Sequence, residues 1–312
     1  MSGPTLVVLA AGLGARFGGA KQFFELGPSG ETFADYSLYE AWRAGFARAL
    51  FIVREENQDL VAHRYKKNWA GRMTVDSAVQ RMDDLPARLS LPAARHKPWG
   101  TAHALWCARK RLKEPFCVVN ADDFYGQEAF AAARQALESA PDDAALVSYP
   151  VGETLSAWGG VARALCRSDA QGWLQEIVEC RSVRHDGERI VSDEHPELRL
   201  EGNAPVSMNF WAFPARAPRL FEPSLRRLAL AAREASTTQP QAELTIAEAV
   251  AECLRAQTLR ARVLREGAGW FGFTYREDAA PAAERLRALA RDGGYPTPLW
   301  SAAPQSCGSE AP

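Results

Sequence analysis

The feature that most constrains this chain is a short apolar run that breaks directly into a glycine-rich loop. The run, Leu6 to Ala11, is long enough for one buried strand and too short to cross a membrane. Residues 12–21 follow it and contain four glycines together with Arg16 and Lys21. Because glycine has no Cβ, such a loop can turn its backbone N–H groups toward a ligand. Free N–H donors and two cations predict a site for a polyphosphate.

The spacing of this loop excludes two common phosphate-binding motifs. A dinucleotide-binding fingerprint needs a third glycine at position 17, which Phe17 occupies. A P-loop needs Gly-Lys-Ser/Thr, whereas Lys21 follows Ala20 and precedes Gln22. The alternative to a phosphate site is a strand-to-helix turn whose charges are solvated.

The loop resembles the opening loop of the nucleotidyltransferases that make activated sugars and alcohols. In that family an apolar strand leads into Ala-Gly-x-Gly-x-Arg and then a Lys a few residues later. The resemblance implies nucleotide binding by Ala11, Gly12 and Gly14. It also implies catalytic roles for Arg16 and Lys21, which would stabilise the triphosphate and the departing pyrophosphate.

The composition is that of an ordinary globular protein, with 312 residues, 47% hydrophobic residues and a net charge of −1. The near-neutral charge argues against a general nucleic-acid or anionic-membrane binder, since both need a basic excess. The six cysteines form no C-x-x-C pair, which argues for reduced thiols and against a zinc site. No Lys or Arg precedes the apolar run, so it does not read as a signal peptide. We therefore expect a cytoplasmic protein with neither a membrane nor a nucleic acid as partner.

Strand and helix patterns alternate up to residue 150. This alternation predicts the α/β class, with a doubly wound, mostly parallel, Rossmann-like sheet. In the second half this alternation stops, and the strands expected there predict a smaller mixed β extension. The expected strands cover residues 6–11, 49–53, 73–75, 116–120, 144–149, 161–165, 174–179, 206–213 and 259–264. The expected helices cover residues 33–48, 56–69, 127–139, 216–235, 244–256 and 279–292, and a further helix follows residues 97–104 and ends at residue 112.

We expect one domain over residues 1–295. Residues 1–150 would form its nucleotide-binding half, residues 151–275 its acceptor-binding half and residues 276–295 a C-terminal helix. The end, residues 296–312, is rich in Pro, Ser and Ala and predicts a flexible tail.

Asp122 and Asp123 directly follow the apolar strand expected at residues 116–120. Ligands of open α/β sheets bind beyond the carboxyl ends of the strands, and Mg²⁺ prefers one or two carboxylates together with phosphate oxygens and water. The segment Ala121–Gly126 resembles the Gly-Asp-Asn and following Tyr-Gly of sugar-1-phosphate nucleotidyltransferases. In that match Asp122 is catalytic and binds the metal, whereas Asp123 is a supporting or capping residue. Adjacent aspartates fit the D-x-D motif of a metal-dependent glycosyltransferase less well.

A third match lies at WGTAHA, residues 99–104, which resembles the Gly-Thr-Gly-His-Ala of N-acetylglucosamine-1-phosphate uridylyltransferases. It implies that Gly100 and Thr101 contact the nucleotide base, because glycine permits close backbone approach and a threonine hydroxyl can donate or accept. Lys97 is predicted as a further phosphate contact. We interpret His103 as a histidine on a helix face rather than as a catalyst.

Two later stretches resemble segments that line the sugar-nucleotide pocket of the same enzymes. WGGVAR matches their Gly-Tyr-Gly-Arg-Ile and implies substrate binding by Gly160. IVECR matches their Ile-Val-Glu-Gln-Lys; it implies that Glu179 accepts hydrogen bonds from sugar hydroxyls and that Arg181 faces the substrate phosphate. An exposed Glu/Arg pair on an edge strand is the alternative. Asn209 is polar within an apolar strand, so we expect it to point into the pocket.

The family's second metal ligand is an Asp that follows a Glu-Leu-x-Ile run. The sequence ELTIAE begins at Glu243 and places Glu248 at the ligand position. Because the side chain of Glu is longer than that of Asp, Glu248 could equally be an exposed helix residue. Glu243 is an alternative metal ligand or a residue at the start of the helix.

The three early motifs occur in the family's order and together imply a nucleotidyltransferase. It would transfer NMP from an NTP to a phosphorylated small molecule, such as a sugar 1-phosphate, and release pyrophosphate with Mg²⁺ as cofactor. The base is open: the Gly-Thr-Ala-His stretch favours UTP, and the Lys-Gln pair favours CTP. A cytidylyltransferase acting on a phospho-alcohol such as phosphocholine is an alternative, as are a glycosyltransferase of the same fold and a non-catalytic nucleotide-binding regulator. The sequence leaves the oligomeric state open.

Overall fold

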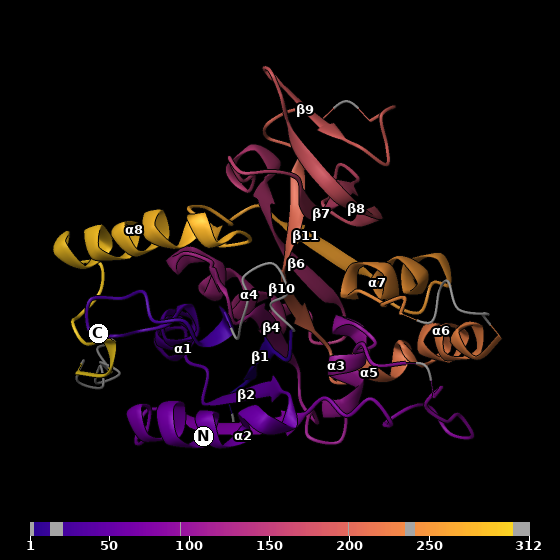
Figure 1. Cartoon of the computed structure of the whole chain (residues 1–312), viewed down its shortest axis with the longest axis horizontal. Helices are drawn as coiled ribbons and strands as arrows, with labels where there is room; N and C mark the ends of the chain where they lie inside the picture. The colour runs from indigo at the N-terminus through magenta and orange to yellow at the C-terminus, as the bar shows by residue number, and fades with distance from the viewer. Residues whose placement is uncertain (1–2, 13–20, 94, 199, 235–240, 302–312) are drawn as a thin grey trace.

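A ten-stranded mixed sheet forms the centre of the protein (Figure 1). The computed structural model describes residues 3–12, 21–93, 95–198, 200–234 and 241–301. The strands run in the order β3-β2-β1-β4-β10-β7-β8-β9, and β6 pairs with both β10 and β11. Their bounds are β1 Thr5–Ala10, β2 Arg48–Val53, β3 Thr74–Val79, β4 Phe116–Asn120, β6 Ala144–Pro150, β7 Val161–Ser168, β8 Leu174–Asp186, β9 Arg189–Ser192, β10 Pro205–Phe213 and β11 Ala261–Leu264. A separate two-stranded sheet joins β5 (Asp123–Phe124) and β12 (Phe271–Gly272).

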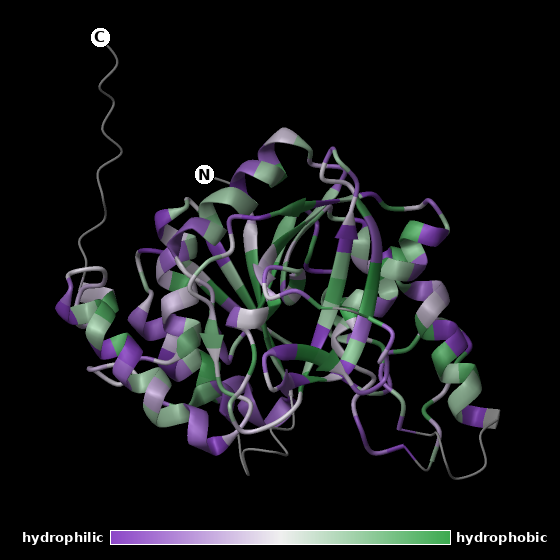
Figure 2. Ribbon diagram, turned by 90° about the horizontal axis from the view of Figure 1, so that it is seen from above, coloured by the Kyte–Doolittle hydropathy of each residue, from purple (hydrophilic) through white to green (hydrophobic). Residues whose placement is uncertain are grey.

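Helices cover both faces of the sheet, which confirms the predicted α/β class. Successive residues of a strand point to opposite faces. Accordingly, Leu6, Val8 and Ala10 of β1 belong to one hydrophobic core, and Val7 and Leu9 belong to the other. The first core packs against α1 (Phe33–Arg43), α4 (Gln127–Ser139) and α8 (Ala279–Arg291), and the second against α3 (Thr101–Ala108), α5 (Ala217–Leu220), α6 (Glu222–Glu234) and α7 (Ile246–Arg255). Figure 2 shows the hydrophobic residues concentrated in the central strands, with hydrophilic residues on the outer surfaces of the helices.

The N-terminal half of the sheet is parallel, as predicted. β1 pairs in parallel with β2 and β4, and β2 pairs in parallel with β3. The antiparallel strands come from the second half of the chain. β10 is the main departure from the sequence analysis, because it lies in the middle of the sheet between β4 and β6 rather than in a separate extension. Its apolar composition fits this central place, since both of its faces are covered.

Several helix boundaries differ from the predicted ones for local reasons. α4 has the predicted bounds. α1 ends at Arg43 rather than at residue 48, because Gly45 with φ of +87° turns the chain into β2. The helix expected over residues 216–235 is two helices, α5 and α6, that meet at Phe221. Pro223 has no N–H to continue the first helix, which explains the break. The helix expected over residues 56–69 is divided into a 3₁₀ turn, α2 (Gln58–Val61) and a π turn.

The segment after α8 packs against the body of the protein at its start, contrary to the expected flexible tail. Leu299 is fully buried, and its N–H donates to Glu31 Oε1 at 3.4 Å. Residues 299–301 form a 3₁₀ turn. A buried leucine stabilises a fold by about 2 kcal/mol, which the composition of the segment did not reveal. The remaining part of the expected tail, residues 302–312, lies outside the described residues.

Across the described chain, we find no helix that combines the length and the apolar character needed to cross a bilayer.

Candidate active site

A cavity of about 540 Å³ opens at the carboxyl ends of β1 and β4, where the glycine-rich loop and the paired aspartates were expected. Most of the predicted site residues that the structure describes line it: Ala11, Gly12, Lys21, Lys97, Gly100, Thr101, Asp122 and Asn209. The cavity is also lined by Leu9, Gln22, Ile52, Gln80, Pro98, Ala104, Asn120, Ala162, Glu243 and Thr274. Arg16 and Gly14, which complete the predicted loop, lie outside the described residues. The tertiary structure thus brings the three early motifs to one site.

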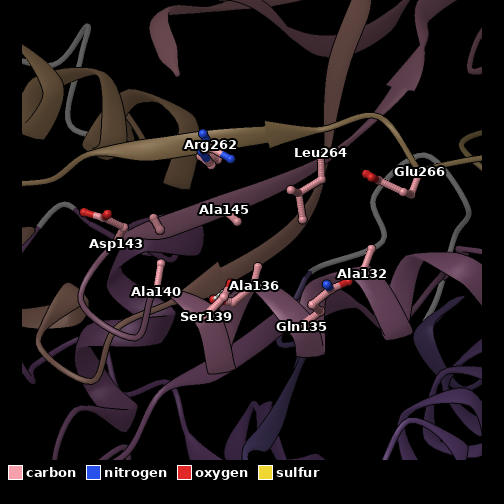
Figure 3. A pocket seen from close by; sticks show the side chains of 12 residues that line it. Ala132, Gln135, Ala136, Ser139, Ala140, Asp143, Ala145, Arg262, Leu264 and Glu266 are labelled. Carbon is pink, nitrogen blue, oxygen red and sulfur yellow. Dashed lines mark hydrogen bonds between the residues drawn. The ribbon is translucent and has the colours of Figure 1, made fainter. Parts of the chain in front are cut away.

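A second, smaller cavity of about 220 Å³ lies between α4 and β11 (Figure 3). Its α4 side is formed largely by alanines, and its β11 side carries Arg262 and Leu264. None of the three early motifs contributes to it. Because convergent polar groups mark a ligand site, the cavity at the carboxyl ends of β1 and β4 is the candidate active site.

The ammonium group of Lys21 contacts the carboxylate of Asp122 at the wall of the cavity. Both side chains are partly buried. Lys21 Nζ also donates to the carbonyl oxygen of Phe273 at 3.2 Å, which fixes the end of this flexible side chain. Partial burial strengthens the attraction between the charges relative to water. A triphosphate in the cavity would compete with Asp122 for the same ammonium group.

Gln22 ties the two ends of the glycine-rich loop together. Its Nε2 donates to the carbonyl oxygen of Gly12 at 2.8 Å, and the side chain is buried. A Cβ at Gly12 would lie 2.8 Å from the same nitrogen, closer than Cβ atoms pack in proteins. The glycine therefore permits the close approach of the Gln22 side chain to the backbone that follows β1.

Asp123 supports the site from behind rather than lining it. Its Oδ2 accepts from Asn120 Nδ2 at 2.8 Å, and Asn120 lines the cavity. Burial raises the pKa of Asp123 to about 7, with a further contribution from the neighbouring Asp122 carboxylate. The Tyr125 hydroxyl accepts from the N–H of Asn120 at 2.9 Å and donates to the Met208 carbonyl at 2.8 Å. This network connects the end of β4 to β10.

Asn209 reaches the cavity because β10 is irregular at that point. The register of β10 against β6 shifts between Ser207 and Trp211, and Asn209 has a φ of +61°. Asparagine tolerates this left-handed conformation better than most residues. Its Nδ2 donates to Asn120 Oδ1 at 3.3 Å. The strand irregularity explains how a residue within an apolar strand comes to line the cavity.

Gly100 and Thr101, at the start of α3, contact the segment that leads into α7. Gly100 has a φ of +99°, and a Cβ there would collide with the backbone of Leu244. Thr101 Oγ1 accepts from the N–H of Ile246, the first residue of α7, at 2.9 Å. The glycine is therefore required both by its conformation and by the close approach of another backbone segment.

Lys97 and Glu243 form an ion pair at the cavity, with Nζ 2.5 Å from Oε1. Both side chains are exposed, so the pair contributes little to the stability of the fold. It places a second cation and a second carboxylate in the cavity that holds Lys21 and Asp122.

Glu248 caps the N-terminus of α7 and does not line this cavity. It forms a capping box with Thr245: its carboxylate accepts from the Thr245 N–H at 2.8 Å, and its own N–H donates to Thr245 Oγ1 at 3.1 Å. The Thr245 hydroxyl also lies 3.4 Å from Glu179 Oε2. Of the two carboxylates considered from the sequence, Glu243 is thus the one at the cavity.

Glu179 lies on β8 beside the α7 cap. Burial raises its pKa to about 7, and the nearby charge of Glu248 contributes in the same direction. Arg181 follows on the same strand; its N–H donates to Glu194 Oε2 at 2.6 Å, and the residue is exposed. Neither Glu179 nor Arg181 is among the residues that line the cavity.

Gly160 also lies outside the cavity lining, two residues before the lining residue Ala162. Its carbonyl oxygen accepts from the Tyr275 hydroxyl at 2.9 Å, and a Cβ there would collide with Ser182 Oγ. In this structure the glycine therefore serves the close packing of the loop before β7 on β8.

Sequence comparison identifies the family. The model of the family described as nucleotidyl transferase matches residues 5–179, more than half of the chain. The chain belongs to the nucleotidyl transferase family. Among curated proteins, no sequence gives a significant match to this nucleotidyltransferase.

Solved structures share the fold of this nucleotidyltransferase over nearly their whole length. A UDP-glucose pyrophosphorylase from Acinetobacter baumannii superposes with a TM-score of 0.57 at 16% identity, covering 93% of this chain and 94% of that one. A UTP-bound UGPase from the same organism gives 0.56 at 16% identity and covers 96% of each chain. A Bacillus anthracis protein assigned as a glucose-1-phosphate thymidylyltransferase gives 0.56 at 13% identity, covering 92% and 95%. At these identities the comparison establishes the fold alone.

The cavity of the nucleotidyltransferase has groups that fit a magnesium ion held partly by a substrate. Among the residues that the structure describes, no group of three or more His, Cys, Asp or Glu side chains could hold a metal ion by itself. Mg²⁺ commonly binds through one or two carboxylates, with substrate phosphates and water as the other ligands. Asp122, with Glu243 in the same cavity, provides that kind of donor set.

Gln80 and Thr274 of the nucleotidyltransferase line the cavity although neither was predicted as a site residue. Gln80 directly follows β3, at the same sheet edge as the ends of β1 and β4. The strand was expected at residues 73–75, whereas β3 continues to Val79. With the correct strand end, the rule that ligands bind beyond carboxyl ends would have identified Gln80. Thr274 lies more than 150 residues further along the chain, and no motif or expected strand end near it indicated a place in the site.

Proposed function

We propose that this nucleotidyltransferase transfers UMP from UTP to a sugar 1-phosphate and releases pyrophosphate. The observation that carries the proposal is the meeting of Lys21 and Asp122 in one cavity with Gly100 and Thr101. An NTP requires three kinds of group: a cation for its phosphates, a carboxylate for a phosphate-bound metal, and a stretch of backbone without a side chain that lets the flat base approach closely. The UTP named for one structural neighbour supports the choice of base.

The reaction requires no protein nucleophile, because the acceptor phosphate is already a nucleophile at neutral pH. The residues of this chain would act by positioning and by charge. Lys21 would leave Asp122 to bind the phosphates and stabilise the charge that develops on pyrophosphate. Asn120 and Asn209, held together by their side-chain hydrogen bond, line the same cavity and would donate or accept hydrogen bonds there. Holding the acceptor oxygen in line with the α-phosphorus would supply much of the rate enhancement.

Asp122 would hold Mg²⁺, with Glu243 as the second carboxylate in reach of the cavity. When bound, the ion would neutralise charge on the phosphates. We also propose that residues 1–150 bind the nucleotide and residues 151–275 the acceptor, within one domain of residues 1–295. Glu179 and Arg181 would then contact the acceptor, Glu179 as an acceptor of hydrogen bonds from sugar hydroxyls.

The test is pyrophosphate release with Mg²⁺, each of the four NTPs, and a panel of sugar 1-phosphates and phospho-alcohols. We expect release with UTP and a hexose 1-phosphate, and none when a chelator removes Mg²⁺. Release with CTP and phosphocholine would overturn the proposed substrates and favour the phospho-alcohol alternative. Turnover of a UDP-sugar without pyrophosphate would indicate a glycosyltransferase. NTP binding without turnover for any acceptor would indicate a regulator.

A further inference from the structure

His103 and Gln80 form a hydrogen-bonded pair at the wall of the cavity beside Gly100. His103 is on α3 and is fully buried, whereas Gln80 lines the cavity. His103 Nε2 lies 3.0 Å from the carbonyl oxygen of Asp84, and Nδ1 lies 3.2 Å from Gln80 Nε2. Gln80 Nε2 also donates to the carbonyl oxygen of Gly100 at 2.9 Å. Neither His103 nor this chain of contacts has a role in the proposed transfer reaction.

The tautomer of His103 follows from its partners. A backbone carbonyl can only accept, so the ring nitrogen next to the Asp84 carbonyl carries the proton. Burial lowers the pKa of His103 to about 4, so the ring is neutral at physiological pH and Nδ1 has a free lone pair. The Asp84 carbonyl is held in place, because the Asp84 carboxylate accepts two hydrogen bonds from Arg109, at 2.8 and 2.9 Å.

The orientation of the Gln80 amide follows in turn. Its NH₂ group faces two atoms that can only accept, Nδ1 of His103 and the Gly100 carbonyl oxygen, and it has two hydrogens to donate. A flipped amide would point its oxygen at both acceptors and lose both bonds. Gln80 Oε1 then has no protein partner among the described residues, and it is not one of the buried unpaired side-chain atoms.

We propose that His103 is a positioning residue that holds the Gln80 amide with its oxygen toward the cavity. The wall beside Gly100 therefore accepts a hydrogen bond from the ligand. A base with a ring N–H at this position, such as N3–H of uracil, would donate that hydrogen bond to Gln80 Oε1. The identity of the ligand rests on the proposed function, whereas the orientation of the amide does not.

The neighbouring Cys107 does not determine the orientation of the Gln80 amide or the tautomer of His103. Its thiol lies 3.6 to 3.8 Å from the ring nitrogens and donates to the Arg81 carbonyl at 3.7 Å. Burial raises the pKa of this thiol to about 12, so it remains protonated. Sulfur contacts of this length are weak, and they leave the shorter Gln80 contact to define the role of Nδ1.

The first experiment measures binding of UTP and of N3-methyl-UTP to the wild-type protein, His103→Leu, Gln80→Leu and the double variant. In the wild type we expect UTP to bind at least tenfold more tightly than its methylated analogue, as expected for the loss of one hydrogen bond. His103→Leu should weaken UTP binding about tenfold and bring the two ligands close together, with kcat changed much less than KM for UTP. In the Gln80→Leu background, His103→Leu should have no further effect on this selectivity.

Two variants separate positioning from stability. His103→Asn retains an acceptor that can face Gln80 Nε2, so it should restore most of the selectivity for UTP over its methylated analogue. His63 is exposed and outside the cavity lining, and His63→Leu should leave the selectivity unchanged. If His103→Leu lowers the melting temperature but leaves the selectivity unchanged, or if its effect adds fully to that of Gln80→Leu, the proposal is wrong.

A second experiment tests the pair without any nucleotide. ¹⁵N NMR of the full chain, assigned with His103→Asn, should show His103 as the neutral tautomer protonated at Nε2 down to about pH 5. The Gln80 amide protons should exchange with solvent more slowly in the wild type than in His103→Leu. Protonation at Nδ1, or equally fast exchange in both proteins, would overturn the inference even if UTP is the substrate. If the NMR results hold but no NTP binds, the proposed function fails and the orientation of the amide stands.

Discussion

Lys21 and Asp122 contact each other because the strands that precede them are parallel neighbours. Lys21 comes after β1 and Asp122 after β4, and the register of these strands places Leu9 opposite Asn120. The carboxyl ends of parallel neighbours meet at one edge of a sheet, so residues far apart in the chain are brought together there. Each of the two charges neutralises the other. This relationship leads to the first two predictions.

Replacing Lys21 by Met should lower kcat by on the order of 10²–10³, the loss typical of one preorganised charge contact in a transition state. The side chain keeps its length and loses its charge, so the fold should retain its far-UV circular dichroism. The measurement is steady-state pyrophosphate release. Lys67 is exposed and outside the cavity lining, and Lys67→Met serves as the control with unchanged activity. A loss of less than about threefold in Lys21→Met would contradict a catalytic role.

Replacing Asp122 by Asn should lower kcat by a similar order and raise the Mg²⁺ concentration needed for half-maximal rate. The amide keeps the size of the carboxylate but binds a hard cation more weakly. A titration of activity with Mg²⁺ at saturating NTP measures both effects. A fall in kcat with an unchanged Mg²⁺ requirement would show that Asp122 acts through Lys21 rather than on a metal.

Glu243→Gln and Glu248→Ala distinguish the two candidates for the second metal carboxylate. Glu248→Ala removes the capping box of α7, so it should destabilise the fold by about 1 kcal/mol, and we expect kcat to change less than twofold. Glu243→Gln should leave the melting temperature unchanged, because its ion pair with Lys97 is exposed. It should lower kcat/KM for the NTP about tenfold. A hundredfold fall in kcat for Glu248→Ala, with a raised Mg²⁺ requirement, would reverse this assignment.

The raised pKa of Glu179 predicts a pH-dependent penalty on stability. The folded protein binds this proton with a pKa of about 7, whereas the ordinary value is 4.5. Between those pH values the folded state holds more protons than the unfolded state, so stability falls as pH rises. The contribution of the protonated carboxyl is fully present below about pH 4.5 and is lost as pH rises through about 7.

Glu179→Gln cannot ionise and should avoid that penalty. Relative to the wild type, the variant should gain stability from pH 5 to pH 8, by an amount on the order of 1–3 kcal/mol. Urea unfolding at both pH values measures the difference, with Glu176→Gln, on the exposed face of the same strand, as the control. Equal pH dependence in wild type and Glu179→Gln would show that the carboxyl titrates normally.

The sequence by itself determined the elements whose signal is local. The alternating apolar runs defined most strands and the α/β class, because burial against two helix layers demands continuous hydrophobic residues. The glycine-rich loop, the aspartates after β4 and the Gly100-Thr101 turn were recognisable because their spacing within one segment carries their chemistry. α4 has its predicted bounds, since its apolar positions repeat with a helical period between a glycine and a turn.

Only the tertiary structure decided what depends on contacts between distant segments. It placed β10 in the centre of the sheet and bent it so that Asn209 faces the cavity. It assigned Glu248 to a helix cap and brought Glu243 to Lys97, a choice that spacing along the chain left open. It also set the Gln80 amide against a buried histidine. Periodicity reports which face of an element is buried, whereas the partner on that face is chosen by how the whole chain packs.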